Sequence, residues 1–240
     1  MTVADSAIRV LTWNVHSFVG RGGVRDPEAV AALIEEAAPD VCALQEIDAR
    51  VALPGIEDPF SYFASRAGWT SVAARTIATA SGHYGHVLMS RWPLELLCVE
   101  DLSEPRREPR HALIAEITAP FAKVAVMAAH LGVRPLERRR QLVRLKRALA
   151  ALDGQPVIAL GDFNDVRLRG VAERSLCPPL EPAPAPRTYP AAFPLFPLDR
   201  VWCAPPLEVL EVRTLSQARR LSDHLPLLAR LRARGDALRS

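Results

Sequence analysis

Short apolar stretches recur along this chain, together with two longer stretches that have helical periodicity. Stretches rich in Val, Ile, Leu and Ala that end at turn-forming or polar residues are typical of strands buried inside a protein. This pattern predicts strands over Ile8–Val15, Asp40–Leu44, Thr70–Thr76, His86–Ser90, Leu94–Val99, Ala112–Ile117, Lys123–Ala129, Pro156–Leu160, Leu198–Trp202, Leu207–Val212 and Leu225–Leu231. The chain is therefore expected to be rich in β-structure from end to end.

Two helices are predicted from their start signals and their periodicity. Asp26 followed by Pro27 and Glu28 has the form of an N-cap, a proline at the first helical position and an acid in the first turn. This helix would end before Pro39. A second helix is predicted over Pro135–Leu152 by an apolar stripe along one face. The stripe consists of Leu142, Leu145, Leu149 and Leu152, and the other side carries Arg138, Arg139, Arg140, Arg144 and Arg147.

The order of these elements favours two sheets packed face to face, with the helices on the outside. Residues 171–197 are rich in proline and lack periodicity, so we predict a surface loop there that is neither strand nor helix throughout. No internal repeat or linker-like stretch interrupts the pattern. Residues 1–240 are therefore interpreted as one α/β domain.

Polar side chains stand at the ends of many of the predicted strands. Side chains in such positions converge on one edge of a sheet, and acids, amides and histidines are costly to bury there unpaired. They are poor packing material, but they suit a hard divalent cation and a phosphate. The residues are, in chain order, Asn14, Glu46, His130, Asp162, Asn164, Asp199, Asp223 and His224.

Hydrolysis of a phosphodiester needs a cation that neutralises the phosphate oxygens, because these oxygens repel the nucleophile. Magnesium prefers oxygen ligands, keeps several of its waters and commonly uses one or two protein carboxylates. Glu46 and Asp223 suit that role, with the amide oxygen of Asn14 as a weaker partner. The pattern therefore predicts a Mg²⁺ site.

The reaction also needs a water molecule that is oriented and deprotonated. Asp162 in the sequence GDFND is the candidate for this task, and Asn164 lies two residues further on, so that both side chains point the same way. Asp199 would fix the tautomer and the orientation of His224, as carboxylates commonly do for working imidazoles. These residues would supply the proton chemistry.

The motifs WNVH, LQE, HL after a strand, GDFN and SDH follow one another over essentially the whole chain. Together they resemble the endonuclease/exonuclease/phosphatase superfamily of magnesium-dependent phosphohydrolases. The resemblance implies an α/β (α+β) four-layer sandwich of the DNase I-like fold, with two mixed β-sheets packed face to face and helices on the outside. It also implies Mg²⁺ as cofactor, with Mn²⁺ able to substitute, and a phosphoester substrate.

The resemblance also assigns roles at the metal. Glu46 matches the principal metal ligand of the family, with Asn14 beside it at the metal and the phosphate. Asp223 matches an acid close to the metal. Asp162 matches the residue that orients and activates the attacking water.

Further roles implied by the resemblance concern the phosphate. Asn164 matches a residue that contacts the scissile phosphate, and His130 lies where the family places a His or Tyr that touches it. Arg110, in REPRHAL, resembles an arginine near the phosphate. His224 matches the histidine that stabilises the pentacovalent phosphate, and Asp199 matches its buried carboxylate partner.

Each of these residues also has a structural interpretation. Asn14 alone would cap a turn, Glu46 alone would be an exposed acid, and a single histidine more often belongs to the core or the surface. The ordered set favours the functional interpretation, because independent coincidences multiply. His86 is a candidate to line the site or bind metal, but the family carries an Asn at its position and a structural strand is favoured. The arginines of residues 138–147 would track a nucleic-acid backbone, although a solvated helix face is the commoner explanation.

Composition adds limited information. With 49% hydrophobic and 24% charged residues, the chain fits a soluble globular protein. The formal net charge of +3 suits acidic substrates without singling out nucleic acid, and genome composition is the favoured reason for the excess of arginine over lysine. The sequence has no signal-peptide pattern and no apolar run of membrane-spanning length, so we expect a cytoplasmic monomer without an integral membrane segment.

The sequence therefore predicts a metal-dependent phosphoric ester hydrolase that attacks a phosphodiester, or a phosphomonoester, directly with an activated water. One substrate alternative is DNA or RNA, cleaved by endo- or exonuclease action. The other is a phospholipid head group, as for sphingomyelinase-like enzymes, which the form WNVH resembles more closely than it resembles AP endonucleases. A remote alternative is an inactive binding scaffold, although such a protein would be expected to lose Glu46 or Asp162.

Overall fold

The computed structural model describes residues 7–152 and 154–234. The first sheet has the order β10 (Leu207–Thr214), β11 (Leu227–Ala233), β1 (Ala7–Asn14), β2 (Val41–Asp48), β4 (Gly82–Ser90) and β3 (Thr70–Thr79). The second has the order β5 (Leu94–Asp101), β6 (His111–Thr118), β7 (Lys123–His130), β8 (Val157–Asp162) and β9 (Asp199–Cys203). The helices are α1 (Pro27–Ala37), α2 (Pro59–Ala67), α3 (Pro135–Ala150) and α4 (Val171–Leu176), with 3-10 turns at His16–Phe18 and Ser216–Arg220.

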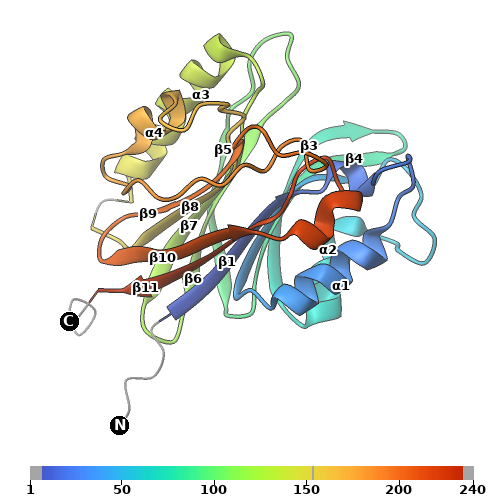
Figure 1. The fold of residues 1–240 in the computed structure, drawn as a ribbon, viewed down its shortest axis with the longest axis horizontal. Coiled ribbons are helices and arrows are strands. Elements are labelled where there is room, and N and C mark those ends of the chain that lie inside the picture. The colour runs from blue at the N-terminus through green and yellow to red at the C-terminus, as the bar shows by residue number, and fades with distance from the viewer. Residues whose placement is uncertain (1–6, 153, 235–240) are drawn as a thin grey trace.

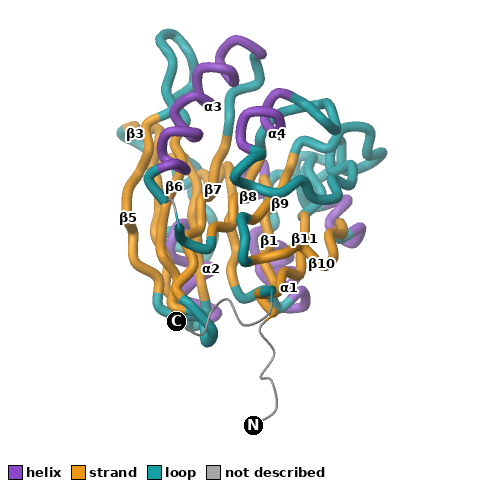
Figure 2. The backbone as a smooth tube through the Cα atoms, turned by 90° about the vertical axis from the view of Figure 1, so that its left-hand side faces the viewer, coloured by secondary structure: helices purple, strands orange, loops and turns teal. Residues whose placement is uncertain are grey.

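The layers are stacked in the order helices, sheet, sheet, helices (Figure 1 and Figure 2). Trp13 and Phe60 belong to the core between the first sheet and helices α1 and α2. Val10 and Ile158 belong to the core between the two sheets. Leu145 belongs to the core under α3 and α4. Both sheets are mixed, because β1–β2 and β7–β8 are parallel pairs and the other pairs are antiparallel. The predicted four-layer α/β sandwich is confirmed.

The two helices on the first sheet begin with the same signal. The carboxylate of Asp26 accepts a hydrogen bond from the backbone N–H of Ala29, so the predicted cap of α1 is confirmed. Helix α2 was not predicted, although Asp58 caps it through the N–H of Phe60 and Gly68 ends it in the left-handed conformation. Its Asp-Pro start was the signal that would have located it.

Two other expectations need correction. Residues 171–197 begin with α4, whose Leu176 is buried under α3, so this segment is not a surface loop throughout. Arg138 is buried rather than part of a solvated face, because its guanidinium turns back to the carbonyls of Gly132 and Val133. The predicted apolar stripe of α3 is confirmed, since all four of its leucines are buried.

The parallel pairs place the site. Strands β1 and β2 end at the same edge of the first sheet, and β7 and β8 end together in the second. In the second sheet His130 pairs with Asp162, and Asp162 pairs with Asp199 across the antiparallel β9. Gly161 permits this approach, since a Cβ there would lie 1.9 Å from the carbonyl oxygen of Ala129. Among the described residues, no helix is long and apolar enough to cross a membrane.

Candidate active site

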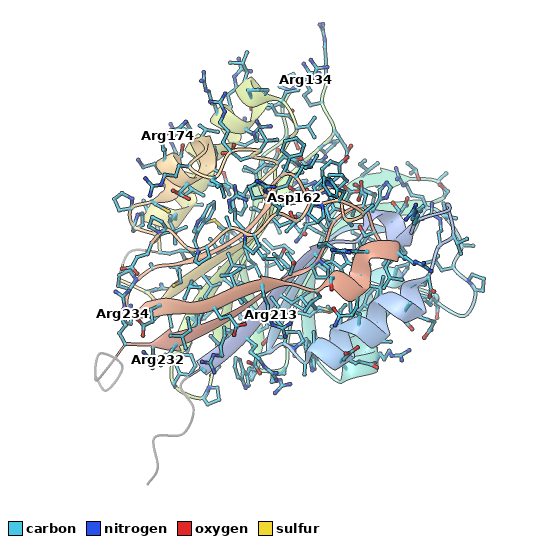
Figure 3. The ribbon with its side chains drawn as sticks, in the orientation of Figure 1. Arg134, Asp162, Arg174, Arg213, Arg232 and Arg234 are labelled. Carbon is cyan, nitrogen blue, oxygen red and sulfur yellow. The ribbon has the colours of Figure 1, made fainter. Side chains whose placement is uncertain are left out.

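The centre of the site is a contact between the two sheets. The side-chain nitrogen of Asn14, at the end of β1, donates to Glu46 Oε1 at 2.8 Å and to Asp162 Oδ2 at 3.1 Å. Its amide oxygen accepts the backbone N–H of His16 at 3.0 Å. Asn14 therefore holds one carboxylate from each sheet side by side, and Figure 3 shows Asp162 where the strand ends meet.

Glu46 reaches this position through a β-bulge that the sequence pattern does not predict. It lies inside β2 rather than after its end, between Leu44 and Ile47, which both face the helices. The register with β4 shifts between those two residues, and Glu46 has a φ of 63°. Because of this bulge, the side chain of Glu46 does not follow the alternation of side chains between the two faces of the sheet, and its carboxylate points toward Asn14. A non-glycine residue in that conformation is strained, and such strain is often found at functional sites.

Asp162 is almost completely enclosed, with 1% of its surface exposed. Burial raises the pKa of this carboxyl and the charge of Asp199 adds to the increase, while His224 and the hydrogen bond from Asn14 oppose it. The other carboxylate oxygen accepts the backbone N–H of Asn164 at 2.9 Å. Asp162 is thus a fixed carboxylate whose proton affinity is higher than usual, which suits a general base.

His224 and Asp199 form a buried pair beside it. The Nδ1 atom of His224 lies 3.0 Å from Asp199 Oδ2, and its Nε2 atom lies 3.8 Å from Asp162 Oδ2. Burial disfavours the imidazolium, but the carboxylates of Asp199 and Asp162 outweigh that effect and raise the pKa of His224. The pair therefore presents a positive Nε2–H toward the space next to Asp162.

His130 and Arg110 approach the site from the ends of β7 and β6. His130 Nε2 lies 3.6 Å from Asp162 Oδ2 and 3.8 Å from Glu46 Oε1. Burial lowers the pKa of His130, and the charge of Arg110 adds to the decrease. Arg110 is 8% exposed and is paired with Glu108. His130 and His224 thus approach the same oxygen of Asp162.

His86 lies inside β4 and is buried. It is 3% exposed, and its buried Nε2 atom has no hydrogen-bond partner. Burial lowers its pKa to about 3, and the charges of His111 and Arg110 contribute. The structure thus places a neutral histidine close to Arg110, within the strand that the sequence predicted.

The loop that carries Asp223 is tied to β1 by residues that sequence reasoning missed. The hydroxyl of Ser222 donates to the carbonyl of Asn14 at 2.7 Å and accepts the N–H of His224 at 3.1 Å. The indole of Trp13 donates to the carbonyl of His224 at 2.9 Å. Asp223 itself is half-exposed, 3.6 Å from His16 Nδ1. The W of WNVH and the S of SDH were visible in the motifs, but only the fold shows that they join the two motifs.

Asn164 lies in the segment that follows β8. It has a φ of 50°, and its side-chain nitrogen donates to the carbonyl of Leu131 at 2.8 Å. This bond joins the segments that follow β7 and β8. The structure therefore gathers six of the predicted residues around Asp162, namely Asn14, Glu46, His130, Asn164, Asp199 and His224. Asp223 is joined to β1 through Ser222, and Arg110 lies close to His130.

The donor set fits a hard divalent cation. Glu46, Asp162, Asp199 and Asp223 bring four carboxylates to one rim, while the lowered pKa of His130 keeps that residue neutral. Oxygen ligands in negative excess are what Mg²⁺ prefers. Asp162, Asp199 and His224 also offer ligand atoms within 4.8 Å of one another, but His224 Nδ1 is already engaged by Asp199 Oδ2 at 3.0 Å. Glu46 and Asp223, whose side chains are more exposed than those of Asp162 and Asp199, thus remain the candidate metal ligands.

Comparison with known proteins identifies the class. A model described as the endonuclease/exonuclease/phosphatase family matches residues 11–224. The chain belongs to this family, whose members are generally metal-dependent hydrolases that act on phosphoesters. It is 35% identical over 178 residues to the uncharacterized protein YbhP of Escherichia coli strain K12, a stretch that covers 68% of this chain and 69% of that protein.

Solved structures agree on the architecture. An endonuclease/exonuclease/phosphatase from Beutenbergia cavernae DSM 12333 matches with a TM-score of 0.75 and 24% identity over 95% of this chain and 72% of that one. A mannosyl-6-phosphatase from Bacteroides thetaiotaomicron VPI-5482 matches with a TM-score of 0.71 and 14% identity over 93% of this chain and 99% of that one. At these identities the similarity establishes the fold alone.

Proposed function

We propose that this protein is a Mg²⁺-dependent phosphoesterase that hydrolyses a phosphodiester by direct in-line attack of an activated water. The observation that carries the proposal is the bridge from Asn14 to Glu46 and Asp162, with a protonated His224 beside it. The bridge sets a candidate metal ligand next to a candidate base. The histidine adds a cation where charge develops in the transition state.

Asp162 orients the attacking water and accepts its proton. Its raised proton affinity keeps it able to take a proton near neutral pH, and its bonds to Asn14 and Asn164 fix its orientation. His224, held by Asp199, stabilises the pentacovalent phosphate through Nε2–H. Asn164, His130 and Arg110 bind the remaining phosphate oxygens.

Glu46 and Asp223 are the proposed metal ligands, with Asn14 beside them. Mg²⁺ bound there would neutralise the phosphate oxygens, and Mn²⁺ would substitute for it. The bonds of Asn14 keep the Glu46 carboxylate from turning away, although two like charges lie close together. A phosphomonoester remains an alternative substrate, because the fold is shared with a mannosyl-6-phosphatase.

The test is Mg²⁺-dependent hydrolysis of bis(p-nitrophenyl) phosphate, supercoiled plasmid and sphingomyelin by the purified protein. An Asp162→Ala preparation, purified identically, excludes contaminating enzymes. We expect turnover of at least one diester that stops with EDTA and is absent from the variant. Equal rates in the two preparations, or hydrolysis of none of these substrates, would contradict the proposal, and hydrolysis of none would leave a phosphomonoesterase and an inactive scaffold as the alternatives.

A further inference from the structure

A cavity of about 270 Å³ lies between α3 and α4, and its lining includes Asp165, the residue that follows Asn164 in the chain. One wall is the segment after β7, with Pro135, Arg138 and Arg139, and the other is the segment after β8, with Asp165 and Arg167 at its start. The same two strands carry His130 and Asp162 at their ends. The cavity walls are therefore direct continuations of the strands that build the site.

The lining of this cavity is strongly basic. Arg138, Arg139, Arg167 and Arg174 face one carboxylate, that of Asp165. This carboxylate is already engaged, because it accepts the backbone N–H of Ala172 at 2.9 Å and that of Arg167 at 3.5 Å. Within residues 7–152 and 154–234, none of the four arginines forms an ion pair, whereas Arg140 and Arg144 on the same helix pair with Glu104.

The walls are held in place by buried groups. Arg200 is 2% exposed, and its guanidinium donates to the carbonyls of Asp165 and Arg167 at 3.2 and 3.0 Å. Arg138 is 6% exposed, and its Nε atom is buried without a partner. A buried donor without a partner is costly, and the fold keeps the charge of Arg138 beneath the cavity in spite of that cost. The cavity is thus preorganised around an excess of donors.

The charges at the cavity also interact electrostatically with the site. Burial lowers the pKa of Arg138, and the carboxylates that oppose this include Asp165 and Asp162. The bond from Asn164 to Leu131 joins the two walls at the edge of the site. Figure 3 shows Arg174 on the α4 side of Asp162. A substrate that reaches Asn164 would therefore have this cavity next to it.

We propose that this cavity binds a second phosphate group of the substrate, next to the phosphate that is hydrolysed. The proposal rests on the proposed function, and it makes the preferred substrate a compound with at least two phosphates. The exposed guanidinium groups of Arg139 and Arg167 would donate paired hydrogen bonds to phosphate oxygens. Arg174, one nitrogen of which already donates to the carbonyl of Arg169, would add positive charge. The buried Arg138 would add positive charge at the wall of the cavity.

The test compares two substrates that differ by one phosphate. Thymidine 5′-(p-nitrophenyl phosphate) has a single diester, and its 3′-phosphorylated form adds the second group. We expect the second phosphate to raise kcat/KM at least about tenfold in the wild type, mainly through KM, because charge-assisted hydrogen bonds are strong. The double variant Arg139→Gln/Arg167→Gln should lose this advantage and keep its rate on the simpler ester. Arg232→Gln, an exposed arginine elsewhere on the molecule, is the matched control.

A direct binding measurement separates this proposal from the proposed function. Calorimetry without magnesium compares thymidine 3′,5′-bisphosphate with thymidine 5′-monophosphate, and we expect the bisphosphate to bind more tightly only while Arg139 and Arg167 are intact. That result would support the cavity even if no ester were hydrolysed. Equal affinities, or an advantage that survives in the double variant, would overturn it. Binding of inorganic phosphate alone, with no advantage for the bisphosphate, would also overturn it and would indicate a site for free phosphate.

Discussion

Arginines on opposite sides of the molecule have different surroundings. Away from the site, Arg232 and Arg234 pair with Glu208, and Arg234 also pairs with Glu181. Arg134 and Arg174 line cavities that border α3, and across the described part of the chain neither has a carboxylate partner. Figure 3 shows the two sets on opposite sides of Asp162. Composition alone does not account for this distribution.

The difference indicates where positive charge is available to a ligand. An arginine that pairs with glutamate contributes little field beyond its partner, and an exposed pair adds little stability. Unpaired arginines on the α3 and α4 side of Asp162 would leave a positive surface next to a negative centre. Such an arrangement suits an anionic substrate that needs a cation at the point of reaction.

The largest effect is expected at the negative centre. Asp162→Asn should lower kcat about 10³-fold, because the amide cannot accept the proton of the attacking water. The comparison needs Glu208→Gln, an acid on the other side of the molecule, which should leave kcat unchanged. Steady-state rates together with circular dichroism check both variants, and a folded Asp162→Asn protein with near-normal kcat would contradict the assigned role.

The next largest effect concerns the metal. Glu46→Gln should raise the Mg²⁺ concentration for half-maximal rate at least about tenfold, because a charged ligand becomes a neutral one. A magnesium titration of the rate measures this, with Glu211→Gln as the control at an exposed acid. An unchanged titration would show that Glu46 is not a ligand.

A smaller effect is expected in the pH dependence. Asp199 helps to raise the pKa of His224, so the imidazolium persists as the pH rises. Asp199→Asn removes that charge and lowers the pKa, so activity on the alkaline side should be lost at a lower pH than in the wild type. The pH profile of kcat/KM tests this prediction. An alkaline limb at the same pH in both proteins would argue against the pair.

The smallest effect is expected among the paired arginines. Arg232→Gln should leave the salt dependence of kcat/KM for an oligonucleotide unchanged, because Glu208 already neutralises this arginine. Arg174→Gln should reduce the slope of log kcat/KM against log salt by about one unit if it contacts a phosphate. Equal salt slopes for the two variants would contradict the difference between the paired arginines at Glu208 and the unpaired arginines that border α3.

Sequence reasoning located the strands and the rim because both depend on local patterns. The run that ends in Asp162 is apolar and short, and its register with His130 follows from parallel pairing. The position of Glu46 was predicted, but not the bulge that turns it, because a bulge depends on how β2 pairs with β4. The arginine-lined cavity could not be predicted from the sequence either. Arg138 and Arg167 lie on segments far apart in the chain, and only the packing of α3 and α4 brings them together.

The most direct test of the central claim is a single-turnover reaction in H₂¹⁸O, with Mg²⁺ and enzyme in excess over bis(p-nitrophenyl) phosphate. Direct attack by water predicts one ¹⁸O atom in the p-nitrophenyl phosphate formed in the first turnover. Product without the label would mean that water did not attack phosphorus, because either an enzyme carboxylate supplied the oxygen or, with the label in p-nitrophenol, the aryl C–O bond broke. Either result would contradict the role assigned to Asp162.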